Sequence, residues 1–272
     1  MKPVRPAPFR PLPFMARDID LQRRDDGSLL LRSRLPLGEV QPHLLHLLSK
    51  HQQERPDHTW LAQRRGPAGE WQRLSYAQAA VQVDAITQAL LNRVPPGRCV
   101  AVLSGNSLEH GVLELAAMKA RAPYVPITTA YSLLTQDLVK LQSMIDLLQP
   151  AVVFAQNGRQ FQRALAGLTL PADALRLVVD DAPADPSTQH WADWLATPVT
   201  GDVARSVAGI TPDTVAKYLF TSGSTGLPKA ATITQRMLMS SLAMHQQVLC
   251  EPAGSQASVF LDWMPWSHVA SG

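Results

Sequence analysis

Residues 99–127 of the chain read CVAVLSGNSLEHGVLELAAMKARAPYVPI, and this stretch predicts the fold. The apolar run at 99–103 is typical of a strand that is buried on both faces. A helix is expected at about 108–120, followed by a short strand at 124–127. Two buried strands joined by a helix predict a parallel pair linked by a right-handed crossover.

The same alternation of strands and helices continues on both sides of this stretch. Upstream, Ser75 and Gln78 have the capping-box spacing that begins a helix, and Pro95-Pro96-Gly97 ends it. Downstream, helices are expected near 137–148 and 159–167, and strands at 151–155, 175–180 and 215–221. The predicted fold class is therefore α/β, a mostly parallel sheet with helices on both faces and ligands beyond the carboxyl ends of its strands.

The remaining segments predict a two-part organisation. Residues 1–40 are interpreted as a proline-rich arm followed by a hairpin within 18–35, with its turn at Asp26-Gly27. The larger part, residues 41–272, begins with a helix at 41–54. Within it, residues 181–213 are expected to form an irregular segment on the surface with one short helix.

Composition excludes several classes of protein. The 272 residues are 46% hydrophobic and 17% charged, which is typical of a globular chain. The net charge of +3 is spread without blocks of like charge, which disfavours nucleic-acid binding. No apolar stretch approaches the roughly 18 residues that a membrane span needs. Cys99 and Cys250 have no zinc-site or disulfide-framework spacing, and a reduced, cytoplasmic compartment is expected.

The residues that follow the strand at 215–221 carry the clearest chemical signal. They read SGSTGLPK, so a loop rich in glycine and hydroxyl groups begins at the carboxyl end of a strand and ends in a lysine. Such a loop can turn its N–H groups toward an anion, while hydroxyls and an ammonium reach phosphate oxygens. The predicted polyphosphate-binding residues are Thr221, Ser222, Gly223, Ser224, Thr225, Gly226 and Lys229.

This loop differs from that of the P-loop kinases. Gly226 lies three residues before Lys229, and Ala230 occupies the position where those proteins have serine or threonine.

The longer stretch YLFTSGSTGLPKAATIT at 218–234 resembles the phosphate-binding signature of the adenylate-forming, or AMP-binding, superfamily. Leu74-Ser75-Tyr76 and the segment at 116–127 resemble two further motifs of that superfamily, with Arg121 at a position where glycine is usual.

A narrower resemblance is to feruloyl-CoA synthase and related acyl-CoA synthetases. It rests on SGNSLEHGVLELAAMKARAPYVPI at 104–127, AYSLLTQDLVKL at 130–141 and LDWMPWSHVASG at 261–272. The last segment implies a carboxylate-substrate pocket that is lined by Trp263, Trp266 and His268. Ser267 and Ala270 depart from the pattern of those enzymes.

The resemblance implies a reaction in two steps. A small carboxylate, of hydroxycinnamate type in the narrower reading, attacks the α-phosphorus of ATP to give an acyl-adenylate and pyrophosphate. The thiol of coenzyme A then attacks the acyl carbon and releases AMP, and magnesium assists at the phosphates. The family's later motifs are not found within the 272 residues. We therefore expect the N-terminal part of such an enzyme, with no identified catalytic or metal-binding residue and no activity alone.

Two alternatives remain open at this point. One is an adenylation domain that serves a carrier protein instead of coenzyme A. The other is a truncated, non-catalytic module that binds nucleotides.

Overall fold

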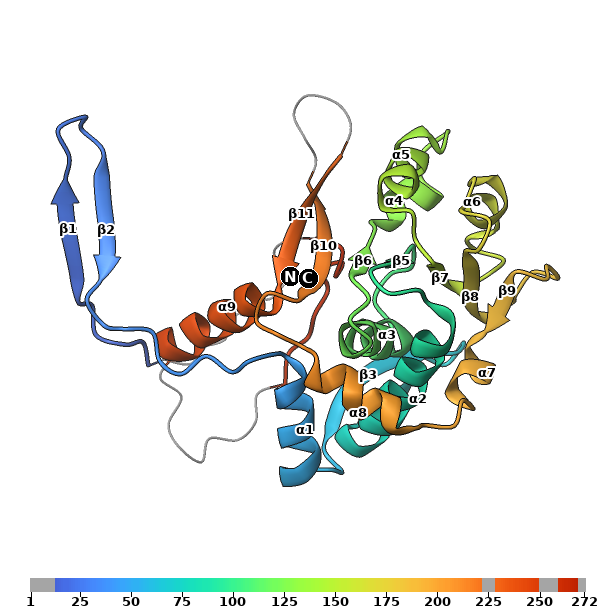
Figure 1. Ribbon diagram of the computed structural model, residues 1–272, viewed down its shortest axis with the longest axis horizontal. Coiled ribbons are helices and arrows are strands. Elements are labelled where there is room, and N and C mark those ends of the chain that lie inside the picture. Colours follow the sequence, from blue (N-terminus) through green and yellow to red (C-terminus); the bar gives the residue numbers. More distant parts are fainter. Residues whose placement is uncertain (1–12, 222–227, 250–258, 269–272) are drawn as a thin grey trace, which may run out of the picture.

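The structure is a computed structural model that describes residues 13–221, 228–249 and 259–268. Its centre is a seven-stranded sheet with the strand order β11-β10-β6-β5-β7-β8-β9 (Figure 1). These strands are β5 (Val100–Val102), β6 (Tyr124–Pro126), β7 (Val152–Asn157), β8 (Leu175–Asp180), β9 (Thr188–His190), β10 (Val215–Thr221) and β11 (Lys229–Thr234). Neighbouring strands run parallel except β10 and β11. The predicted α/β class with a mostly parallel sheet is confirmed.

The central strand β5 is buried on both faces of the sheet. Val100 and Val102 belong to one hydrophobic core, whereas Ala101 and Leu103 belong to the other, because successive side chains of a strand point to opposite faces. The helices are α1 (Leu45–Glu54), α2 (Tyr76–Arg93), α3 (Leu108–Lys119), α4 (Thr129–Leu133), α5 (Val139–Leu148), α6 (Gln162–Gly167), α7 (Trp191–Leu195), α8 (Gly201–Ala208) and α9 (Gln235–Val248). Figure 1 shows α2, α3 and α8 on one side of the strands and α4, α5 and α6 on the other.

The order of the strands creates a crevice at one edge of the sheet. After β5 the chain adds β6 on one side of it, and then crosses to add β7 on the other side. The segments that follow β5 and β7 therefore diverge, and this switch point is where open parallel sheets bind ligands.

The start of α2 follows the capping box predicted from the sequence. The hydroxyl of Ser75 accepts a hydrogen bond from the N–H of Gln78 (3.2 Å), and the side-chain oxygen of Gln78 accepts one from the N–H of Ser75 (2.9 Å). Gly97, in the Pro-Pro-Gly turn after the helix, has a φ of +81°, which glycine adopts at little cost.

The hairpin predicted within 18–35 is also present. Strands β1 (Ile19–Arg23) and β2 (Leu29–Ser33) pair antiparallel around a turn in which Gly27 has a φ of +81°. Figure 1 shows this ribbon standing apart from the central sheet. The helix predicted at 41–54 begins later, at Leu45.

Three features of the connecting segments differ from the prediction or were not predicted. Residues 181–213 contain β9 and two helices, α7 and α8, instead of one short helix. Residues 229–234 form β11 at the edge of the sheet, a strand that was not predicted. A second hairpin, β3 (Thr59–Arg65) and β4 (Glu70–Ser75), was not predicted. These strands are edge or two-stranded elements with polar side chains, so they lack the apolar runs that identify buried strands.

Arg121 occupies a position of left-handed backbone between α3 and β6. Its φ is +57°, which agrees with the glycine that is usual at this position in the proteins it resembles. The guanidinium reaches across to α8, where its Nε donates to the hydroxyl of Ser206 at 3.4 Å.

Cys99 is buried, at 3% exposure, and burial raises the pKa of its thiol to about 11. The thiolate is therefore scarce at neutral pH, and Cys99 acts as a small apolar side chain. Cys250 lies outside the described residues. Among the described residues, no helix combines the length and the apolar composition needed to cross a membrane.

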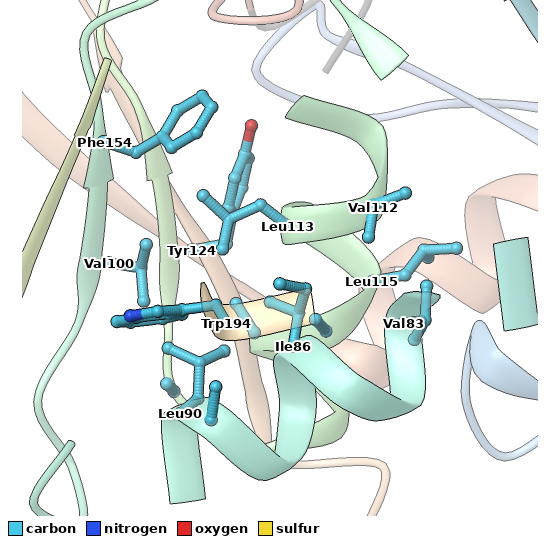
Figure 2. Packing of buried hydrophobic residues seen from close by; sticks show 14 of the residues in the cluster. Val83, Ile86, Leu90, Val100, Val112, Leu113, Leu115, Tyr124, Phe154 and Trp194 are labelled. Carbon is cyan, nitrogen blue, oxygen red and sulfur yellow. The ribbon is translucent and has the colours of Figure 1, made fainter. Parts of the chain in front are cut away.

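Among the described residues, Trp194 is the largest fully buried side chain, and it belongs to one of the two hydrophobic cores. Figure 2 shows its indole next to Leu90 and Val100, which brings together α7, α2 and the central strand. The guanidinium of Arg93 lies 5.4 Å from the ring centroid. The indole N–H is buried and has no hydrogen-bond partner among the described residues.

We predict that Trp194→Ala lowers the free energy of unfolding by about 3–5 kcal/mol, because it leaves a large cavity. Trp194→Phe should cost less, since it keeps most of the apolar volume and removes the unpaired N–H. Urea unfolding followed by circular dichroism measures both changes. Trp71→Ala is the control, because Trp71 is 48% exposed; a loss as large as that of Trp194→Ala would contradict the assignment.

Candidate functional site

The candidate site lies at the carboxyl edge of the central sheet. Strands β5, β6, β7 and β10 run parallel, so their carboxyl ends share this edge. The residues there are mainly small or polar: Ser104, Gly105 and Asn106 after β5, Thr128 and Thr129 after β6, Gln156 and Asn157 in β7, and Thr221 in β10. Side chains of this kind can hydrogen-bond a polar ligand.

Two of the predicted phosphate-binding residues are described, and they lie opposite each other. Thr221 ends β10, Lys229 begins β11, and the two are paired across the antiparallel strands. The hydroxyl of Thr221 donates to the carbonyl oxygen of Lys229 at 3.4 Å. The other predicted residues, Ser222, Gly223, Ser224, Thr225 and Gly226, lie outside the described residues.

The side chain of Lys229 lies at the exposed start of β11. Lys229 is exposed, and the carboxylates of the described residues form their ion pairs with other cations. An exposed lysine beside the end of a strand can therefore give its charge to a phosphate ligand.

Residues 259–268, the tryptophan-rich segment, border a cavity of about 310 Å³ at the same edge. Trp266 is half-buried, and its indole N–H donates to Oδ2 of Asp262 at 2.6 Å. Trp263 is 84% exposed. The cavity is lined by Ser104, Gly105, Asn106, Thr129, Asp262, Trp263, Pro265, Trp266 and Ser267. Both predicted tryptophans thus lie at this cavity.

His268 lies farther from it. This side chain is exposed, and it is not among the residues that line the cavity. Its backbone N–H donates to the carbonyl oxygen of Pro265 at 2.9 Å, in a turn that closes the segment.

Asn106 joins the tryptophan-rich segment to the central sheet, a role that the sequence analysis did not identify. Its Nδ2 donates to the carbonyl oxygen of Met264 at 2.8 Å, and its Oδ1 accepts from the backbone N–H of Trp266 at 2.9 Å. The ring of His110, one turn into α3, contacts the ring of Trp266 edge-on with centroids 5.1 Å apart. The only signal in the sequence was the position of Asn106 just beyond a buried strand.

A larger cavity of about 540 Å³ adjoins the first one and shares part of its lining. Its walls come from the ends of β5, β7 and β8 and from the β3–β4 hairpin. Arg65 from that hairpin forms an ion pair with Glu109 of α3. Sequence analysis missed this cavity because it missed the hairpin that forms one wall.

Comparison with known proteins identifies the family. The model of the family described as AMP-binding enzyme matches residues 48–272, which is most of the chain. The chain belongs to the AMP-binding enzyme family. The glycine- and hydroxyl-rich sequence after β10 and the cavities at the edge of the sheet therefore belong to an AMP-binding enzyme.

Two curated relatives illustrate the breadth of the family. A linear gramicidin synthase of Brevibacillus parabrevis is 28% identical over 211 residues, covering 74% of this chain and 4% of that protein. Long-chain-fatty-acid–CoA ligase FadD15 of Mycobacterium bovis is 26% identical over 229 residues, covering 82% of this chain and 36% of that protein. The chain thus spans well under two thirds of the length of both relatives.

A solved structure has the same fold. Acetoacetyl-CoA synthetase from Streptomyces lividans superposes with a TM-score of 0.61 at 20% sequence identity, covering 85% of this chain and 35% of that protein. At this level of identity the likeness concerns the fold.

Beneath the tryptophan-rich segment, this AMP-binding enzyme has a buried ion pair. Lys217 of β10 is 4% exposed, and its Nζ lies 2.9 Å from Oε1 of Glu114 on α3. Tyr124 of β6 is the cross-strand neighbour of Lys217. A lysine inside an otherwise apolar strand is stable only when a carboxylate of this kind meets it.

His110 lies beside this pair and is fully enclosed. Its Nδ1 lies 2.9 Å from the carbonyl oxygen of Gly105, which can only accept, so Nδ1 carries the proton. Its Nε2 and the hydroxyl of Tyr124 are buried and have no hydrogen-bond partner among the described residues. Burial is the largest effect and lowers the pKa of His110; the hydrogen bond to Gly105 and the charge of Glu114 partly oppose it, and the charge of Lys217 adds a small further lowering. His110 is therefore neutral at pH 7.

We predict that Lys217→Ala lowers the free energy of unfolding by about 3 kcal/mol, because it leaves the carboxylate of Glu114 without its cation. The double variant with Glu114→Ala should lose at least about 1 kcal/mol less than the sum of the single losses. Urea denaturation of the four proteins gives the coupling energy. Lys119→Ala, which breaks the more exposed pair with Asp84, should cost below about 1 kcal/mol. If the loss of unfolding free energy in the double variant equalled the sum of the two single losses, Lys217 and Glu114 would not stabilise each other and the ion pair would be contradicted.

We also predict that His110 makes the fold sensitive to acid. The folded state keeps His110 neutral, whereas the unfolded chain binds a proton below the ordinary pKa of 6.5. Stability is therefore lost as the pH falls through 6.5, by at most about 1.4 kcal/mol per pH unit.

In His110→Gln, the decline in unfolding free energy between about pH 7 and 5.5 should be smaller than in the wild type. Denaturation series at several pH values measure it. Contributions from other histidines cancel in the comparison, and His190→Gln, at an exposed position, serves as the control. Equal slopes for His110→Gln and wild type would rule out this role.

Proposed function

We propose that this chain belongs to an enzyme that activates a carboxylic acid with ATP and transfers the acyl group to coenzyme A. The proposal rests on one observation: the strand that leads into the loop and the cavity beside Trp266 lie at the same edge of the sheet. The strand that leads into the glycine- and hydroxyl-rich loop runs parallel to β5 and β6, and the cavity beside Trp266 lies at the ends of those same strands. A phosphate ligand and an acid can thus be bound side by side.

The residues of the phosphate side are those predicted from the sequence. Thr221, residues 222–226 and Lys229 would hold the β- and γ-phosphates of ATP through N–H groups, hydroxyls and one ammonium. Lys229 fits this role because it is exposed and has no ion pair with the described carboxylates. Magnesium, bound mainly by the phosphates themselves, would neutralise part of their charge.

The acid side is formed by Trp263 and Trp266, with His268 in the adjacent turn. Indole walls offer a flat apolar surface, and the cavity of about 310 Å³ has the size of a small organic acid. Together with the resemblance to feruloyl-CoA synthase, this supports an aromatic acid of hydroxycinnamate type. Placing the carboxylate next to the α-phosphate would accelerate its attack mainly by proximity and charge neutralisation.

A second candidate acceptor is the thiol of a carrier protein. This alternative is supported by the similarity to the linear gramicidin synthase, which is 28% identical to this chain. The FadD15 ligase, whose name specifies coenzyme A, supports the first proposal and covers more of this chain. The choice of acid separates the two, since a peptide synthetase domain activates amino acids.

The proposal includes the arrangement of the chain. Residues 41–272 would be the N-terminal part of an adenylation domain, preceded by the arm and hairpin of residues 1–40. The spacing of Cys99 and Cys250, which fits neither a disulfide framework nor a zinc site, supports a reducing, cytoplasmic location.

We predict that Lys229→Ala weakens ATP binding about 10-fold or more, because it removes a charge-assisted contact to phosphate. Isothermal titration of ATP into purified residues 1–272 measures the affinity. Lys50→Ala, at another exposed lysine, is the matched control and should bind ATP like the wild type. Unchanged affinity of a folded Lys229→Ala protein would contradict the phosphate site.

The acid is identified by acid-dependent exchange of labelled pyrophosphate into ATP, measured in the natural full-length protein with ferulate, cinnamate, a medium-chain fatty acid and amino acids. The proposal expects the highest kcat/KM for the hydroxycinnamates. Exchange with amino acids alone would favour the carrier-protein alternative.

A further inference from the structure

The tryptophan-rich segment has few supports of its own. Residues 259–268 contain no helix or strand, and Val259, Phe260, Leu261 and Trp263 are each more than 80% exposed. A segment of this kind keeps a defined position only if specific contacts hold it to a rigid element. The position of Trp266 at the cavity therefore depends on contacts with the central sheet.

Asn106 makes two hydrogen bonds to this segment from a single side-chain amide. It donates to the carbonyl oxygen of Met264 (2.8 Å) and accepts from the N–H of Trp266 (2.9 Å). The two backbone groups belong to residues on either side of Pro265, which has no N–H of its own. The amide thus pairs with the segment as the peptide group of a neighbouring strand would.

Asn106 is itself held firmly on the central sheet. It follows β5 and precedes Ser107, whose side chain caps α3 by accepting from the N–H of His110 at 3.0 Å. Nδ1 of His110 donates back to the carbonyl oxygen of Gly105 at 2.9 Å. The turn that carries Asn106 is therefore tied to a buried strand and a buried helix.

Two further contacts orient the ring of Trp266 once its backbone is held. The ring meets that of His110 edge-on, and its indole N–H donates to Asp262 at 2.6 Å. Asp262 also accepts from the N–H of Met264 at 3.0 Å. Loss of the Asn106 bonds would release the backbone on which this arrangement depends.

We propose that Asn106 is the positioning residue of the acid-binding cavity, which it sets by fixing the backbone of Met264 and Trp266 to the end of β5. The inference rests on the proposed function and deepens it. Asn106 acts through Trp266 and not on the phosphates, so its loss should weaken binding of the acid and leave binding of ATP unchanged.

The test compares Asn106→Ala and Asn106→Asp with wild type and with Asn92→Ala, a matched change at an exposed position on α2. Hydrogen exchange read by mass spectrometry follows peptides that contain residues 262–267. The N–H of Trp266 should exchange at least about 10-fold faster in Asn106→Ala, since its acceptor is gone. Asn106→Asp keeps an acceptor for this N–H and should lie nearer to wild type. Asn92→Ala should change nothing.

The kinetic arm uses acid-dependent pyrophosphate exchange in the full-length protein. KM for the acid should rise about 10-fold in Asn106→Ala, whereas KM for ATP should stay within about two-fold, with Asn106→Asp intermediate. Thermal melts verify that each variant is folded. If Asn106→Ala does not fold, the comparison of Asn106→Asp with wild type still tests the proposal.

The outcomes separate the inference from the proposed function. Unchanged exchange at Trp266 in folded variants, or equal rises in KM for acid and ATP, would overturn the role of Asn106 while leaving acid activation in place. A wild-type protein with no acid-dependent exchange for any acid would overturn the proposed function, and with it the positioning role, even if the hydrogen-exchange result stood.

Discussion

The structure depends on the burial of one short strand, β5, between two layers of helices. Val100 and Val102 pack into one core and Ala101 into the other, all of them fully buried. Because both faces are covered, polar side chains are displaced to the ends of the strand. Because the chain adds β6 and β7 on opposite sides of β5, the two following segments separate and leave space at the carboxyl edge.

This edge brings together groups that are far apart in the sequence. Asn106 bonds to Met264 and Trp266 across 158 and 160 residues. Strand β10 delivers the phosphate loop to the same edge, and its Lys217 is neutralised within the fold by Glu114. Lys229, by contrast, is exposed and forms no ion pair with the described carboxylates. We propose that this cation and the indoles beside the cavity act in one binding site, because activation of an acid by ATP requires the acid and the phosphates to be held together.

Much of the fold was predictable because its signals are local. Apolar runs identified β5, β7 and β8, and the spacing of Ser75 and Gln78 identified the start of α2. β9, β11 and the β3–β4 hairpin were missed, since these strands lie at an edge or in a two-stranded ribbon and lack the continuous apolar runs of buried strands. The cavities were missed because their walls come from segments that are separate in the sequence. The tryptophans at the cavity were found through resemblance, whereas the role of Asn106 is visible only in three dimensions.

The central claim is that the phosphate loop and the tryptophan-lined cavity form one binding site. A crystal structure of the full-length protein with a non-hydrolysable hydroxycinnamoyl-adenylate analogue tests it most directly. The account predicts the aromatic acyl group against Trp266, in the cavity bordered by Asn106, with the phosphate mimic directed toward the loop that ends at Lys229. An analogue bound with its acyl group away from Trp266, or with its phosphate mimic remote from Lys229, would contradict it.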